Sequence, residues 1–159
     1  MPDYFFDSSA LVKRYHIELG TPTVLQVIDA TANAIRISRL TVVELISAFA
    51  IQVRTQVISR DDATLFQRML RDDIASGRFE VFPVSEIEFS LAEGLLERHA
   101  VDFRLRALDA FQLSGCDRAQ GARPRRSFCC GRPSALRCCG PRGISTGQSG
   151  GCVRRFRSA

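Results

Sequence analysis

The sequence predicts an α/β domain built around a mostly parallel sheet. Three short apolar segments, residues 4–6, 34–38 and 79–83, have the composition of buried strands. A helical pattern separates each segment from the next, and no tight hairpin joins any two of them. Strands that alternate with helices favour parallel pairing, with helices covering both faces of the sheet. The chain of 159 residues is long enough for one domain with a hydrophobic core.

The expected helices follow from apolar periodicity and from capping residues at their starts. Thr41 with Glu44 has the spacing of a capping box, as do Ser59 with Asp62 and Ser85 with Glu88. Pro22 suits the first turn of a helix, where its missing N–H costs nothing. The helices are expected over residues 9–16, from about residue 22 through 28, and over 41–53, 59–76, 85–99 and 105–113.

An acidic residue, Asp7, directly follows the first strand and precedes two serines. This order places its carboxylate at the carboxyl end of the strand, the edge where open α/β sheets bind ligands. A carboxylate at that edge is suited to a hard divalent cation. The other interpretation is that Asp7 only caps the following helix.

Two further acids have informative positions. Glu44 follows the second strand within a helical turn, so its side chain is expected near the same edge of the sheet. Asp109 interrupts an otherwise apolar helical pattern, and a buried carboxylate without a partner costs free energy that a metal ion would offset. A capping role for Glu44 and solvent exposure for Asp109 are the alternatives.

Three segments together resemble a PIN domain, and most closely the VapC-type toxins of bacterial type II toxin–antitoxin systems. The segments are DSSALVKRY at residues 7–15, LTVVEL at 40–45 and LRALDAFQL at 105–113. The similarity spans residues 3–113 with the expected order and spacing.

The resemblance implies a three-layer α/β/α fold and an endoribonuclease that depends on Mg²⁺ or Mn²⁺ and cleaves structured RNA. It also implies a cognate antitoxin protein that inhibits the enzyme, and pairing into a homodimer. Asp7, Glu44 and Asp109 match three metal-binding catalytic acids of the family, and Ser9 matches the small hydroxyl residue beside the first acid at the cofactor site. Lys13, Arg14 and Arg39 are then candidates to contact the RNA backbone, and a solvated helix face is the more common role for any one such residue.

Location and membrane contact are predicted from the apolar runs. No run approaches the roughly 18 apolar residues of a membrane span. The first residues are strand-like and lack a basic-then-apolar leader, so we expect a cytoplasmic protein with no membrane contact.

The composition changes sharply near residue 115. Residues 1–115, the PIN-like domain, carry 12 Lys and Arg against 16 Asp and Glu, whereas residues 116–159 carry 10 Arg against the single acid Asp117. All six cysteines also lie in this second part. The Arg/Cys/Gly-rich tail has neither helical nor strand periodicity, so we expect it to be disordered and the C-terminal strands of the family to be missing.

A shifted reading frame is the interpretation we favour for residues 116–159. Suitable codons for residues 125–133, read one base later, encode Val-Asp-His-Phe-Val-Ala-Ala-Asp, an apolar strand that ends in an acid. The adjacent cysteine pairs lack the two-residue gap of zinc knuckles, and a basic RNA-binding arm is the other alternative. A frameshift would remove a fourth family acid, so this chain is expected to be weakly active or inactive.

Two other functions remain open from sequence. A catalytically dead PIN fold could act as an antitoxin-binding module. A DNA nuclease is the third hypothesis, because clustered acids alone do not distinguish RNA from DNA.

Overall fold

The central element of the fold is a parallel β-sheet. The computed structural model describes residues 3–103, 105–120 and 126–129. Its four described strands are β1 (Asp3–Phe6), β2 (Ala34–Ser38), β3 (Phe79–Phe82) and β4 (Arg126–Cys129). They are arranged in the order β3-β2-β1-β4, and all three neighbouring pairs are parallel. The predicted α/β class and the parallel pairing are therefore confirmed.

Helices connect the strands, mostly where the capping pattern predicts them. The short α1 ends earlier than expected and continues into a single 3-10 turn, η1. Within the described residues, no helix combines the length and apolar character that a bilayer crossing requires. The helical elements are α1 (Ser8–Leu11), η1 (Val12–Arg14), α2 (Thr21–Asp29), α3 (Arg39–Arg54), α4 (Arg60–Ala75), α5 (Glu86–Phe103) and α6 (Ala107–Gln120).

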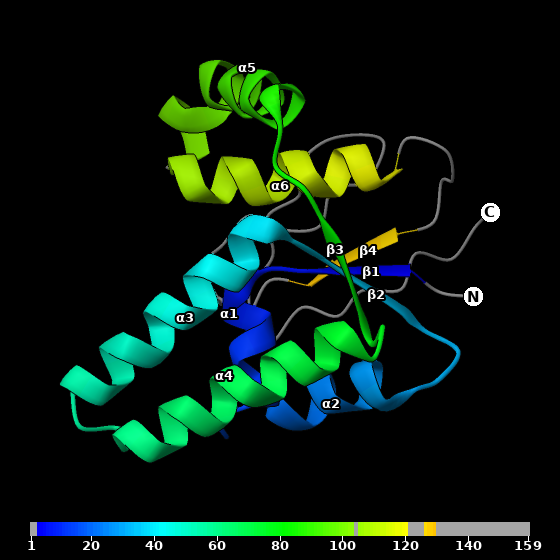
Figure 1. Ribbon diagram of the computed structural model, residues 1–159. Coiled ribbons are helices and arrows are strands. Elements are labelled where there is room, and N and C mark those ends of the chain that lie inside the picture. The colour runs from blue at the N-terminus through cyan, green and yellow to red at the C-terminus, as the bar shows by residue number, and fades with distance from the viewer. Residues whose placement is uncertain (1–2, 104, 121–125, 130–159) are drawn as a thin grey trace.

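Each face of the sheet has its own core, because successive strand residues point to opposite faces. Tyr4 and Phe6 of β1 pack with buried residues of α1, α2, α3 and α4, whereas Phe5 packs with α5 and α6. Figure 1 shows α5 and α6 on one side of the strands, with α2 and α4 on the other. Helices on both faces are compatible with an α/β/α fold.

Helix α6 lies close against the sheet. A Cβ atom added to Gly115 would be 3.1 Å from Cζ of Phe5, whose side chain is fully buried. Glycine therefore allows the middle of α6 to approach β1 closely. This contact holds the helix over the sheet with its first turn toward the carboxyl end of β1, where Asp7 lies.

The predicted capping boxes have different outcomes. The Ser59–Asp62 box at the start of α4 is confirmed in both directions. The Thr41–Glu44 box is wrong, because Ser38 at the end of β2 caps α3 by accepting a hydrogen bond from the Thr41 backbone N–H. The helix starts earlier than the apolar pattern indicates, which leaves the Glu44 side chain available for other contacts.

The C-terminal expectations need two corrections. The predicted boundary at residues 115/116 falls inside α6, which continues to Gln120. The expected absence of a later strand is also wrong, because β4 pairs with β1 and covers its edge. Backbone pairing with β1 forms this strand without the apolar alternation that sequence analysis requires. The remainder of the predicted tail lies outside the described residues.

Candidate functional site

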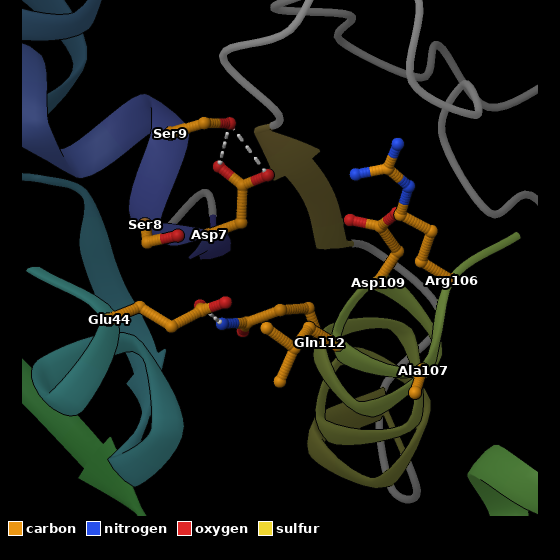
Figure 2. A pocket seen from close by; sticks show the side chains of 9 residues that line it. Asp7, Ser8, Ser9, Glu44, Arg106, Ala107, Asp109 and Gln112 are labelled. Atoms are coloured by element: carbon orange, nitrogen blue, oxygen red, sulfur yellow. Dashed lines mark hydrogen bonds between the residues drawn. The ribbon is translucent and has the colours of Figure 1, made fainter. Parts of the chain in front are cut away.

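A pocket of about 290 Å³ opens at the carboxyl end of β1. It lies where the loop after β1 meets the starts of α3 and α6, and Figure 2 shows side chains from these three regions facing it. All three acids selected from the sequence line this pocket, together with Ser9. The lining residues are Asp7, Ser8, Ser9, Glu44, Arg106, Ala107, Leu108, Asp109 and Gln112.

Asp7 is held firmly beside the short helix α1. Its carboxyl oxygen Oδ1 accepts a hydrogen bond of 2.8 Å from the backbone N–H of Ala10. The hydroxyl of Ser9 lies 2.9 Å from Oδ1 and 3.0 Å from Oδ2 of the same carboxylate. Asp7 is only 8% exposed. The capping role is therefore confirmed, and it places the carboxylate at the pocket rather than away from it.

Glu44 enters the pocket from the second turn of α3. Its Oε2 accepts a hydrogen bond of 2.5 Å from the side-chain amide of Gln112 on α6. Burial raises the pKa of Glu44, and the negative charges of Asp7 and Asp109 raise it further, against hydrogen bonds from Gln112 and Ser8 that lower it. Glu44 is therefore close enough to both Asp7 and Asp109 for their negative charges to oppose its ionisation.

Asp109 lies in the first turn of α6 and is partly exposed. Sequence analysis considered a buried carboxylate here, but the side chain borders the pocket and Figure 2 shows it beside Arg106. A negative charge in the first turn of a helix is favourable because the exposed backbone N–H groups carry partial positive charge. Asp109 is therefore favourable at the start of α6 without a buried partner.

The donor chemistry of the pocket fits a hard divalent cation. Its three carboxylates supply only oxygen ligands, and among the described lining residues one guanidinium, that of Arg106, opposes their charge. Over the described parts of the chain, however, no three acidic, histidine or cysteine side chains form a ready-made metal-binding group. In Figure 2 the Asp7 carboxylate lies toward Ser9, and that of Glu44 lies toward Gln112.

Three of the polar lining residues were missed from the sequence, and Gln112 and Arg106 are the most informative of them. Both lie three positions from Asp109, so the helical repeat places them on the same side of α6. That spacing was a readable signal once Asp109 had been selected. Ser8, the third, gave no signal beyond its position next to Asp7.

Two of the basic residues expected to contact RNA are instead paired within the fold. Lys13 is 7% exposed and its Nζ donates to Glu18 Oε1 at 2.5 Å. Arg14 forms salt bridges with Asp29 and Asp73. Both pairings lie in the region of η1, α2 and α4, and the basic residue that borders the acids in the pocket lining is Arg106.

Comparisons of the chain with protein-family models and with curated proteins found no match. The inference of a function therefore depends on the chemistry of the pocket and on the three segments that line it.

Proposed function

We propose that this protein is a Mg²⁺- or Mn²⁺-dependent endoribonuclease with a PIN-like fold, the toxin component of a type II toxin–antitoxin system. One observation carries the proposal: Asp7, Glu44 and Asp109, from three distant parts of the chain, line a single pocket. Burial raises the pKa of Glu44, and the charges of Asp7 and Asp109 contribute to the same shift. Clustered acids with perturbed pKa values are typical of functional sites.

The roles of individual residues follow from their contacts. Asp7, Glu44 and Asp109 would hold the cation, while Ser9 and the Ala10 N–H keep the Asp7 carboxylate in place. When bound, Mg²⁺ or Mn²⁺ would activate water for attack on phosphorus and neutralise charge on the phosphodiester. Arg106 is exposed at the same pocket, and its guanidinium is suited to bind a phosphate of the RNA.

The C-terminal part of the chain bears on how active this protein is. The resemblance implies a fourth acid at the end of a strand that follows α6, but β4 has the sequence Arg-Ser-Phe-Cys. We therefore propose that a shifted reading frame replaced this acid and reduced activity. Sequencing the gene tests that point: if no other frame encodes an apolar strand ending in an acid, the frameshift hypothesis is wrong.

An RNA-cleavage assay tests the proposed activity. The purified 159-residue chain is incubated with structured RNA in Mg²⁺ or Mn²⁺, with chelator as the blank and single-stranded DNA as a competing substrate. Weak cleavage of RNA is expected for the wild type and none for Asp7→Asn. A matched control is Asp102→Asn, which removes an exposed acid of α5 and should leave cleavage unchanged. RNA cleavage that survives both the chelator and Asp7→Asn would contradict the proposal.

The second candidate is an antitoxin-binding module that does not cut RNA. The observation that favours it is the engagement of both Asp7 oxygens by Ser9, together with the absence of a ready-made metal-binding group in the described residues. A growth assay distinguishes the two functions. Growth inhibition that is relieved by Asp7→Asn supports the nuclease, whereas inhibition indifferent to this change supports binding alone.

A further inference from the structure

Among the described residues, Gln112 alone has a side chain that hydrogen-bonds to Glu44, to the N-cap Ser38 and to Thr41 in the first turn of α3. Its amide nitrogen donates to Glu44 Oε2 at 2.5 Å. Its carbonyl oxygen accepts from the hydroxyls of Thr41 at 3.0 Å and Ser38 at 3.2 Å. The Gln112 side chain therefore connects α6 to the N-cap and the first two turns of α3.

The hydrogen-bond partners fix the orientation of this amide. A carboxylate only accepts hydrogen bonds, so the nitrogen of Gln112 must face Glu44. The hydroxyl of Ser38 already accepts from the Thr41 backbone N–H and has its own proton left to donate to the Gln112 carbonyl. A flipped amide would place its oxygen against the carboxylate of Glu44, which has no proton to donate, and the hydrogen bond to Glu44 would be lost.

Burial makes this network rigid. Gln112 is 4% exposed, Ser38 is 2% exposed and Thr41 is fully buried. A buried amide that lost these partners would carry the full cost of its desolvation, so the observed arrangement is strongly preferred. Glu44 is thereby held on the α6 side of the pocket, the side on which Asp109 lies.

We infer that Gln112 is a positioning residue that holds the Glu44 carboxylate at the pocket and sets the affinity of the site for a divalent cation. This inference rests on the proposed function, because the cation is that of the nuclease. Gln112 would raise the affinity of the site for the cation without itself being a metal ligand. Partners that orient metal ligands typically contribute 10- to 100-fold, roughly, to metal affinity.

Mn²⁺ binding by isothermal titration calorimetry tests the inference, using the full chain at a temperature where every variant is folded. Gln112→Met keeps the length of the side chain and removes both polar groups, and we expect its Kd for Mn²⁺ to rise at least about tenfold. Thr41→Val removes one of the two hydroxyl donors to the amide and should give a smaller increase. Gln26→Met, on the exposed side of α2, is the matched control and should bind as the wild type does.

A metal-free measurement separates this inference from the proposed function. The side-chain amide resonance of Gln112 in a ¹⁵N-resolved NMR spectrum should move on Glu44→Leu, and that of Gln26 should not. Wild-type affinity in Gln112→Met, or an unmoved Gln112 resonance, would overturn the positioning role. If the resonance moves but the wild type binds no Mn²⁺, the nuclease proposal fails while the hold of Gln112 on Glu44 stands.

Discussion

The hydroxyl of Ser9 bridges both carboxyl oxygens of Asp7, at 2.9 and 3.0 Å. The two residues are separated by one position, and the backbone N–H of Ala10 adds a third hydrogen bond to the same carboxylate. A group held by several donors keeps one orientation. The start of α1 is therefore both a helix cap and the fixed wall of the acidic pocket.

Replacing Ser9 by alanine is expected to lower RNA cleavage without unfolding the protein. The change removes the bridging hydroxyl, which costs about 1 kcal/mol of stability, a typical net value for one hydrogen bond. The Asp7 carboxylate then loses part of its fixed orientation. Cleavage rates and urea unfolding of Ser9→Ala and Ser9→Thr check this, since threonine retains the hydroxyl. Equal cleavage by both variants and the wild type would show that the bridge has no role at the site.

The capping and chemical roles of Asp7 can be separated by two substitutions. Asn caps helices about as well as Asp, so Asp7→Asn should unfold at a urea concentration close to that of the wild type while losing cleavage. Asp7→Ala also loses the cap and should cost about 1 kcal/mol more. Urea titrations followed by circular dichroism measure both values. An Asn variant as unstable as the Ala variant would mean that the charge, and not the cap, supports the fold.

Glu44→Gln is expected to stabilise the folded protein at neutral pH. Burial and the neighbouring acids raise the pKa of Glu44 above its unfolded value, so ionised Glu44 destabilises the folded state. This loss of stability is complete when the pH is above the raised pKa of Glu44 in the folded protein. It disappears when the pH falls below the pKa of Glu44 in the unfolded chain. The stabilisation by Gln should therefore be present at pH 7 and vanish near pH 4. Urea titrations across this range measure it, and a Gln variant less stable than wild type at pH 7 would contradict the assignment.

Divalent cations are expected to stabilise the wild type by relieving repulsion among the three acids. At a concentration about 100 times the Kd, a ligand specific for the folded state adds about 2.7 kcal/mol. Thermal unfolding with Mg²⁺, with Mn²⁺ and after chelation measures the change. Asp7→Asn should show a much smaller response, and the Asp102→Asn control should respond fully. An equal response in all three proteins would place the bound ion elsewhere.

Strand β4 is expected to contribute to stability by covering the edge of β1. A chain that ends at residue 120 lacks this strand and leaves the backbone groups of β1 unpaired on that side. A chain that ends at residue 129 retains it. We expect the shorter chain to unfold at lower urea and to aggregate more readily, as measured by light scattering. Identical behaviour of the two truncated chains would show that the β1–β4 pairing adds nothing.

The sequence predicted the elements better than it predicted their contacts. Strand β2 was predicted correctly because apolar residues alternate along it, and two of them, Ile35 and Ile37, are buried in the structure. The start of α3 was misplaced because Thr41–Glu44 imitates a capping box, whereas the true cap, Ser38, belongs to the strand. Strand β4 was missed because its pairing depends on the exposed edge of β1, a long-range property that the local pattern Arg-Ser-Phe-Cys does not contain.

In the candidate site, too, the positions of residues were predicted better than the contacts between them. The positions of Asp7 and Glu44 after strands were enough to predict that these two acids share an edge, whereas Asp109 was added to them by the resemblance. The sequence could not show that Gln112 bonds to Glu44, because 68 positions separate the two residues and only tertiary packing brings them together. It also could not distinguish Arg106 from Lys13, since both are basic and only the fold buries one of them.

The wide separation of the pocket residues along the chain affects when the pocket can form during synthesis. Asp7 is made first, and Asp109 and Gln112 follow about one hundred residues later, on the last of the described helices that pack against β1. A ribosome-bound chain that has not yet released α6 from the exit tunnel has no complete pocket. The pocket therefore first exists only after the chain has been synthesised well beyond Gln112.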